Sequence, residues 1–327
     1  HPSPERGTWL LTFQQGYEAK LNLVIDPLPP HQIVGLWIGP ASPVAGELAG
    51  LVPEFKKLPG KVSFSASRLD DKGVHPLAGL NPDSPLALGS GFKLFVLGAL
   101  IEDLEGKKRR WTDTLALKPD LKSLPSGFLQ TWPVGSPLTL HTLASLMISK
   151  SDNTATDHLV MALGREHIEG AMGRMGVSNS GLSLPFLTTR EMFLLKGTDH
   201  GNGVPLYLAK GVTERRAYLR DVVSHQALSE AGDFGDGGPP RAIDRLEWFA
   251  SSQDMVRAMD WLRRHTATRV AKPAREILAI NPGVDLDDKT WSYIGFKGGS
   301  EPGVLSATFL LESRQGQWYG LSACWSN

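Results

Sequence analysis

Two residues that could cooperate in nucleophilic catalysis stand at the head of a long apolar segment. Ser90 and Lys93 are three positions apart, and residues 94–101 are apolar on every face, which predicts a helix buried inside a domain. Ser90 would lie at the helix N-terminus, where free N–H groups and the dipole favour developing negative charge. Lys93 would lie one turn on, close enough to contact the serine oxygen. Burial lowers the pKa of a lysine, so Lys93 is a candidate base and Ser90 a candidate nucleophile, although an N-cap role alone would also explain Ser90.

A second group of polar residues could assist this pair. Ser151, Asp152 and Asn153 stand just ahead of another predicted helix. Asp152 is typical of a helix N-cap, which is a purely structural role. Ser151 could relay a proton to a leaving nitrogen, and Asn153 could hold a substrate amide.

The third group is the run Lys297-Gly298-Gly299-Ser300. We expect it to end one strand and to open a tight turn, where the glycines let the backbone approach a ligand closely. The N–H groups of Ser300 and Ser90 would then form the two halves of an oxyanion hole. Lys297 would attract a substrate carboxylate, unless it is an ordinary strand-edge lysine.

Composition excludes several classes of function. The chain has 327 residues, with 41% hydrophobic and 21% charged residues, which is ordinary for a globular protein of one large domain or two unequal ones. Lys+Arg and Asp+Glu number 34 each, so nothing favours binding to nucleic acid. Cys324 is the single cysteine, and the absence of zinc motifs predicts no metal and no other cofactor.

Location follows less directly from the sequence. No segment is long and apolar enough to predict a membrane span. The chain begins at His1, as a processed or shortened chain would, so a signal peptide could have been removed. We therefore expect a periplasmic or secreted protein, with a cytoplasmic location as the alternative.

The elements that must position these residues are strands at both ends of the chain and helices between them. Residues 1–44 form a β-rich N-terminal segment with turns at 14–16 and 26–30, and it either extends a neighbouring sheet or ends a small α+β domain. Residues 45–327 would form the main domain. We expect its strands at 61–66, 291–296, 305–312 and 317–325. We expect its helices at 44–55, 94–105, 139–147, 153–164, 165–176, 189–195, 214–228 and 251–264. This order predicts an antiparallel sheet covered by helices, with a long irregular insert at 197–247.

The three motifs together resemble those of class A β-lactamases and penicillin-binding proteins. Their order S-x-x-K, S-D-N and K-T/S-G is typical of that superfamily, and the flanking run 147–156 also looks like the surroundings of its second motif. The resemblance implies an α/β (α+β) β-lactamase/transpeptidase-like fold with a helical subdomain. It further implies an acyl-enzyme mechanism in which Ser90, Lys93, Ser151 and Lys297 are catalytic, while Asn153, Gly298, Gly299 and Ser300 bind substrate.

Two departures from the class A pattern concern the third motif and the Ω-loop. Gly298 stands where the family has Thr or Ser, so one hydroxyl for the β-lactam carboxylate is missing, and Ser300 could replace it. The loop pattern E-x-x-L-N has its counterpart in residues 191–195, with Leu195 in place of Asn. Glu191 could be the base that activates the deacylating water, but it also fits the third helical position of a capping box begun by Thr188, and we favour that interpretation.

These departures, the β-rich start and the insert also resemble, more loosely, the two-domain β-lactamase-like proteins of clavulanic acid gene clusters, which act like esterases. The expected function is therefore a serine hydrolase with weak β-lactam hydrolysis on a small-molecule substrate. One alternative is a carboxylesterase acting on small esters or a bicyclic intermediate, or an enzyme acting on peptidoglycan. Another is a non-hydrolytic penicillin-binding or sensor protein.

Overall fold

The computed structural model describes residues 5–12, 17–38, 42–43, 48–124, 126–232, 238–284, 286 and 289–327. The chain divides into two compact units, His1–Glu54 and Phe55–Asn327. The expected boundary after residue 44 falls earlier in the chain than this division. The expected turn at 14–16 and the start of the 44–55 helix lie outside the described residues.

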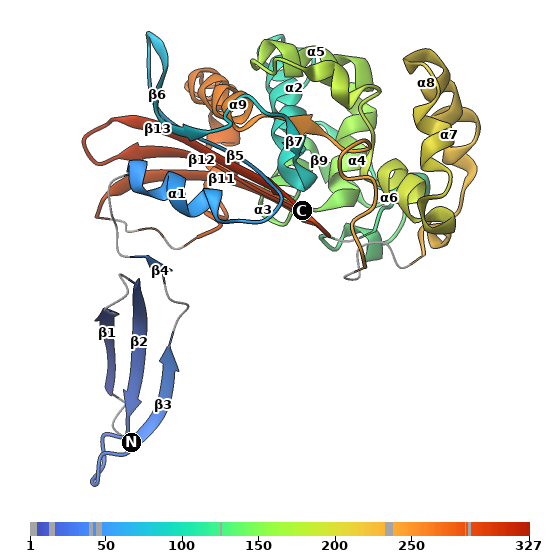
Figure 1. Cartoon of the computed structure of the whole chain (residues 1–327). Coiled ribbons are helices and arrows are strands. Elements are labelled where there is room, and N and C mark those ends of the chain that lie inside the picture. Colours follow the sequence, from blue (N-terminus) through green and yellow to red (C-terminus); the bar gives the residue numbers. More distant parts are fainter. Residues whose placement is uncertain are drawn as a thin grey trace. The chain divides into compact units, whose positions relative to one another are not determined.

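The first unit is a small antiparallel sheet (Figure 1). Strands β1 (Glu5–Thr12), β2 (Tyr17–Ile25) and β3 (Ile33–Ile38) lie in that order, and β4 (Ser42–Pro43) also pairs with β2. The unit provides little hydrophobic core, because every residue of β3 except Gly35 is exposed. Sheets of this size need packing against another element for stability.

The second unit is built on a five-stranded antiparallel sheet. Its order is β11 (Trp291–Glu301), β12 (Val304–Ser313), β13 (Trp318–Ser326), β5 (Lys61–Asp70) and β6 (Gly73–Leu80). The last three strands of the chain therefore join the first two strands of the unit through the pairing of β13 with β5. Helix α9 (Ser252–His265) packs against β5, β12 and β13, and it begins at a capping box formed by Ser251 and Asp254.

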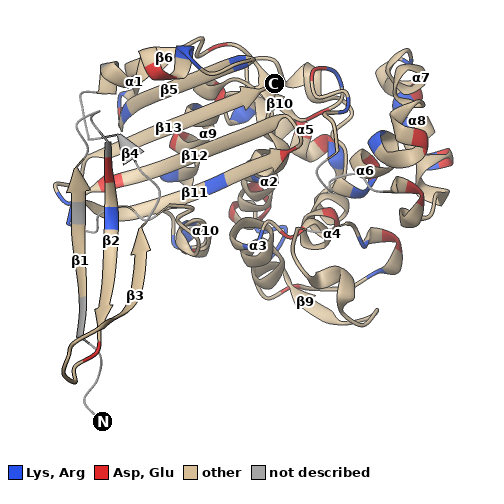
Figure 2. Ribbon diagram, turned by 60° about the horizontal axis from the view of Figure 1, so that its bottom comes forward, with Lys and Arg blue, Asp and Glu red and all other residues tan. Residues whose placement is uncertain are grey.

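A group of helices lies beside this sheet, next to β11 (Figure 2), with Lys and Arg interspersed among Asp and Glu. Helix α2 (Lys93–Glu105) is central to it, since residues 93–101 of α2 are all buried, as the apolar segment predicts. The other helices of this unit are α3 (Leu140–Ser149), α4 (Asn153–Leu163), α5 (Arg165–Arg174), α6 (Thr189–Gly197), α7 (Val204–Leu208), α8 (Val212–Asp221) and α10 (Lys272–Ala279). Short strand pairs join β7 (Leu86–Ala87) to β10 (Phe249–Ala250) and β8 (Thr114–Ala116) to β9 (Pro137–Thr139).

The fold class expected from the sequence is confirmed, with two local differences. The helix expected at 214–228 is α8, which ends at Asp221, and α7 precedes it within the insert. The strand expected at 291–296 is longer than predicted, because β11 continues to Glu301. No helix of the described ranges is long and apolar enough to cross a membrane.

Candidate active site

Ser90 lies in a single 3-10 turn, Gly89–Phe92, that leads directly into α2. Gly89 has a φ of +47°, a left-handed conformation that side chains rarely adopt. Leu88 fixes the turn from both sides, because its N–H donates to Trp248 O at 3.0 Å and its carbonyl accepts from Ser306 Oγ at 2.6 Å. The predicted nucleophile is thus half-buried at the head of a helix whose residues 93–101 are all buried.

Lys93 is completely buried on the first turn of α2. Its Nζ donates to Asn153 Oδ1 at 2.6 Å, to Ser151 O at 2.6 Å and to Ser151 Oγ at 3.1 Å. Among the hydrogen bonds of the described residues none joins Lys93 to the Ser90 hydroxyl, so the direct contact expected from the spacing is not present. Lys93 instead joins the serine turn to the second motif.

The second motif connects α3 to α4. Asp152 is the N-cap of α4, as predicted: its Oδ1 accepts from Ala155 N at 2.8 Å, while Oδ2 accepts from two N–H groups of residues 128–129. Asn153 is the first residue of α4, and its Nδ2 donates to Leu124 O at 2.9 Å. Ser151 has a φ of +54°, a strained conformation for a serine that directs its hydroxyl toward the two site lysines.

Lys297 approaches the same hydroxyl from the sheet. Its Nζ lies 3.1 Å from Ser151 Oγ and also donates to Gly298 O. The expectation that residues 297–300 end a strand and form a turn is wrong. They lie within β11, which remains paired with β12 as far as Glu301 and Val304, so the turn falls at residues 302–303. This pairing holds the third motif rigidly against the serine turn.

The close packing around β11 explains why two glycines stand in the third motif. A Cβ on Gly299 would lie 2.1 Å from Leu88 O and 2.4 Å from Ser90 N, so only glycine lets the strand approach the turn this closely. A Cβ on Gly298 would lie 2.8 Å from the ring of Phe296. The hydroxyl-bearing residue found here in the family would therefore need Phe296 to move.

The amide nitrogens of Ser90 and Ser300 lie at this same contact. A Cβ on Gly89 would be 2.9 Å from Ser300 N, and one on Gly299 would be 2.4 Å from Ser90 N. The two N–H groups nominated as an oxyanion hole thus come from elements whose backbones touch. That proximity is what stabilisation of one oxyanion by two donors requires.

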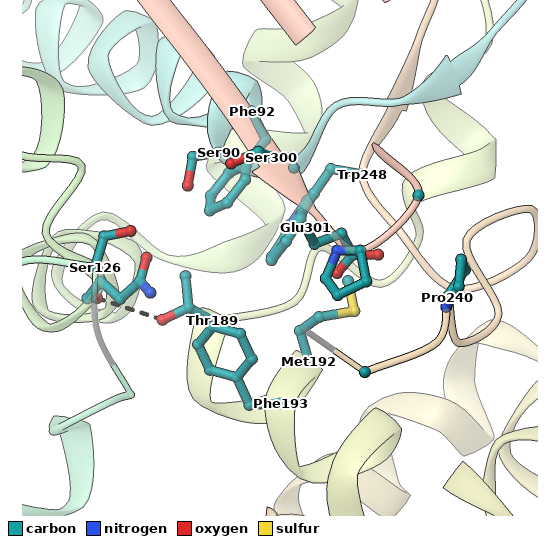
Figure 3. A pocket seen from close by; sticks show the side chains of 15 residues that line it. Ser90, Phe92, Ser126, Thr189, Met192, Phe193, Pro240, Trp248, Ser300 and Glu301 are labelled. Carbon is teal, nitrogen blue, oxygen red and sulfur yellow. Dashed lines mark hydrogen bonds between the residues drawn. The ribbon is translucent and has the colours of Figure 1, made fainter. Parts of the chain in front are cut away.

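Two cavities open on either side of the serine. The larger, of about 610 Å³, is bounded by the serine turn, α6 and the end of β11 (Figure 3). The smaller, of about 370 Å³, includes Lys297 and Ser151. Ser90, Ser126 and Ser300 line both cavities, so a substrate can extend in two directions from the reacting carbonyl.

The buried lysines have unusual protonation behaviour. Burial, and secondly the nearby Lys297 charge, hold the pKa of Lys93 well below its ordinary value. Burial lowers the pKa of Lys297 to about 7. Because desolvation disfavours an ammonium, Lys93 is the group better prepared to accept a proton, while Lys297 titrates near neutral pH.

Glu191 lies away from this centre, on the first turn of α6. Its carboxylate accepts from Thr188 N at 2.8 Å, which completes the predicted capping box. Both of its oxygens also bind Arg165, at 2.8 and 3.0 Å. It does not line either cavity, whereas Thr189, Met192 and Phe193 of the same helix line the larger one.

Ser126, Trp248 and Glu301 are among the residues of the larger cavity that the sequence did not indicate. Ser126 sits next to Asn153, whose N–H donates to Ser126 O at 3.1 Å. Trp248 stacks on Phe92 with ring centroids 3.7 Å apart, and Glu301 follows Ser300 on β11. None carries a motif, and only long-range packing brings them to Ser90. Among the described residues no group of three or more His, Cys, Asp or Glu could hold a metal ion.

Comparison with known proteins finds a matching family model. Residues 44–268 match the model of the family described as "Beta-lactamase enzyme family", a range that includes the first two motifs and ends before Lys297. No curated protein sequence matches the chain significantly.

Several solved structures have a similar fold. A point mutant of PBP-A, solved as an acyl-enzyme complex with penicillin-G, has 15% identity and a TM-score of 0.58 over 85% of this chain and 86% of that chain. A β-lactamase from Sphaerobacter thermophilus has 20% identity and a TM-score of 0.58 over 85% and 88%. A β-lactamase from Francisella tularensis has 14% identity and a TM-score of 0.59 over 85% and 89%.

Proposed function

Because this chain belongs to the beta-lactamase enzyme family and is a β-lactamase-like serine hydrolase, we propose that it works through an acyl-enzyme formed on Ser90. The observation that carries the proposal is the position of Ser151 Oγ. It lies 3.1 Å from the Nζ of both Lys93 and Lys297, in a cavity that Ser90 also lines. Two lysines on one hydroxyl form a path along which a proton can move between nucleophile and leaving group.

In acylation, Ser90 Oγ attacks the substrate carbonyl while its proton passes to the neutral amine of Lys93. The lowered pKa of Lys93, caused mainly by burial, supports its role as base. Negative charge develops on the carbonyl oxygen, where the N–H groups of Ser90 and Ser300 would stabilise it. The tetrahedral intermediate then expels its nitrogen or oxygen leaving group.

Ser151 would protonate that leaving group. Its hydroxyl proton moves to the departing atom, and Lys93 replaces it with the proton taken from Ser90, so the charges balance. Lys297, on the other side of the hydroxyl, would bind a substrate carboxylate when protonated. Asn153, held by Lys93 and Leu124 O, would hold a substrate amide.

Deacylation is the step that we expect to be slow. Glu191 is engaged by Thr188 and Arg165 and does not line the cavities, which supports the capping role over that of water-activating base. Leu195, where class A enzymes carry Asn, offers no polar ligand for such a water. A poorly held nucleophile reduces the rate by orders of magnitude, so weak β-lactam hydrolysis follows.

Two other functions share this acylation chemistry. A carboxylesterase would deacylate fast on small esters, and a penicillin-binding or sensor protein would remain acylated. The second is supported by the similar structure of PBP-A, a mutant of which was captured as an acyl-enzyme with penicillin-G.

Intact-mass measurement after mixing with penicillin-G separates these functions. We expect an adduct that forms quickly and decays over minutes to hours, and no adduct with Ser90→Ala. An adduct that never decays would favour the sensor function. Ester cleavage without any penicillin adduct would favour the esterase. No adduct and no ester cleavage would contradict the acyl-enzyme proposal.

A further inference from the structure

A buried group of charges adjoins the larger cavity and takes no part in the proposed chemistry. Lys196 of α6 donates from Nζ to Glu301 Oε1 at 2.6 Å and also to Glu247 Oε1. The side chains of Lys196 and Glu247 have no exposed surface, whereas that of Glu301 keeps 12%. Of the three residues, only Glu301 lines the cavity.

The rest of that cavity has both apolar and uncharged polar walls. Its hydrophobic side chains are Phe92, Met192, Phe193, Pro240, Trp248 and Pro302, and its uncharged polar side chains are Ser90, Ser126, Asn153, Thr189 and Ser300. Glu301 is the only acidic residue among the described residues that line it, and Figure 3 shows it among the lining side chains. The cavity therefore combines aromatic walls with a single carboxyl group.

The carboxyl groups of Glu247 and Glu301 share the ammonium group of Lys196. Burial, and then the neighbouring Glu247, raise the pKa of Glu301 to about 9, so the pair retains a proton when the cavity holds no cation. Arg241, the other cation next to Lys196, donates to the Lys196 backbone carbonyl at 3.3 Å. A ligand ammonium at Glu301 could displace the shared proton and compensate the second carboxylate.

The position along β11 indicates which part of a substrate would meet Glu301. Lys297 and Ser151 lie in the smaller cavity, where the leaving group and its carboxylate would be bound. Ser300 lies between the two cavities, and Glu301 follows it on the side of the larger one. The larger cavity therefore receives the acyl group that remains on Ser90.

We propose that Glu301 determines acyl-group specificity, and that the larger cavity selects an acyl group carrying both an aromatic ring and a protonated amine. The inference rests on the proposed acylation of Ser90. The ring would pack against Trp248 and Phe92, and the ammonium would bind the Glu301 carboxylate, with additional attraction from the aromatic faces.

Paired substrates that differ only in the amine test this specificity. The probes are the p-nitrophenyl esters of phenylacetic acid and of 2-amino-2-phenylacetic acid, each corrected for spontaneous hydrolysis. We expect wild-type kcat/KM to be roughly tenfold higher for the amino ester, as one charge-assisted contact provides. Glu301→Gln should reduce that ratio to about one.

Glu247→Gln is the matched control, because it changes the same charge group without changing the cavity wall. It should retain part of the preference for the amino ester, because the Glu301 carboxylate remains in the cavity wall although the second carboxylate is gone. The ratio of two substrates on one protein does not depend on the fraction that is folded, so lost stability does not obscure the result. If neither glutamine variant folds, the wild-type ratio and inhibition by benzylamine compared with benzyl alcohol still test the site.

Equal kcat/KM for both esters in the wild type would overturn the inference. So would a preference for the amino ester that survives Glu301→Gln. If neither ester acylated Ser90 in the wild type, the proposed function would be contradicted. That result can be told apart from acylation without selectivity, which contradicts only the inference about Glu301.

Discussion

Ser151 is the residue on which two other candidate catalytic groups, Lys93 and Lys297, converge. It takes up a strained backbone conformation, with a φ of +54°, and its hydroxyl lies between two lysines that are both almost fully buried. Two ammonium groups this close repel each other, so at least one is favoured in its neutral form. A neutral lysine that can accept a proton therefore lies beside the Ser151 hydroxyl, which can relay one.

Ser90 and Lys93 are tested by substitution. Ser90→Ala should abolish ester hydrolysis and all labelling by a serine-reactive phosphonate, because no other hydroxyl occupies the head of α2.

Lys93→Ala should slow single-turnover acylation by roughly 10²-fold or more, as loss of a general base does. Stopped-flow acylation measures both. Turnover by Ser90→Ala within tenfold of wild type would contradict the assignment of the nucleophile.

The pKa of Lys297 predicts a pH dependence of substrate binding. Burial lowers this pKa to about 7, so the ammonium is present below pH 7 and is lost above it. KM for a substrate that carries a carboxylate, such as penicillin-G, should rise by about tenfold per pH unit above pH 7. KM for an uncharged ester should stay nearly constant over the same range. A penicillin KM that is flat up to pH 9 would show that Lys297 does not bind the carboxylate.

At the scale of elements, the contact between β11 and the serine turn positions the site. It is a backbone-to-backbone contact, since Cβ atoms at Gly89 and Gly299 would meet main-chain atoms of the opposite element. Ser306 of β12 strengthens it through its 2.6 Å hydrogen bond to Leu88 O. The strand and the turn therefore move together, and any added volume at the contact displaces the nucleophile.

Gly299→Ala tests this contact. The new Cβ would lie 2.1 Å from Leu88 O, so the turn must shift, and overpacking of this kind costs about 1–3 kcal/mol. We expect kcat/KM to fall by at least about 10²-fold because the nucleophile is misplaced, with a lower Tm. Gly316→Ala is a comparison for loss of a left-handed glycine away from the site, since nothing lies within 4 Å of its Cβ position. It should lower Tm without changing kcat/KM.

Helix α6 provides the test of Glu191. Glu191→Gln keeps a capping side chain but loses the ion pair with Arg165, so unfolding free energy should fall by about 1–2 kcal/mol while turnover stays within twofold. Asp254→Asn is the matched control, because Asp254 completes the capping box of α9 and pairs with Arg257 at 2.9 Å. Urea unfolding and mass spectrometry of the acylated enzyme provide the readouts. An acyl-enzyme that accumulates only in Glu191→Gln would restore Glu191 as the deacylation base.

At the scale of the whole molecule, the two units differ in how much core they contain. The main cluster of buried apolar residues extends from Leu69 to Cys324 and lies entirely within the second unit. The first unit has exposed apolar side chains on β3, including Leu36 and Trp37. The stability of the hydrolase unit should therefore depend little on residues 1–54.

Removal of residues 1–54 tests that independence. We expect the shortened chain to unfold in one transition with a Tm close to that of the corresponding transition of the full chain, and to keep its kcat/KM for a small ester. The physical reason is that all candidate catalytic residues and the main core lie in Phe55–Asn327. A shortened chain that is unfolded or inactive would show that the first unit is required.

Local sequence was sufficient to predict the features that depend on neighbouring residues. The buried helix after Ser90 and the caps provided by Asp152 and Thr188 arise from short-range patterns of apolar spacing and side-chain capping. The fold class followed because the motifs occur in the order of a known superfamily.

Tertiary structure alone decided how those elements meet. The position of residues 297–300 within β11 depends on pairing with β12, which extends the strand beyond its apolar run. The preference of Lys93 for Ser151 and Asn153, from 58 and 60 positions away, and the charge group that holds Glu301 depend on contacts between distant segments. Such contacts leave no periodic pattern in the sequence, because their energy comes from groups that become neighbours only after the chain has folded.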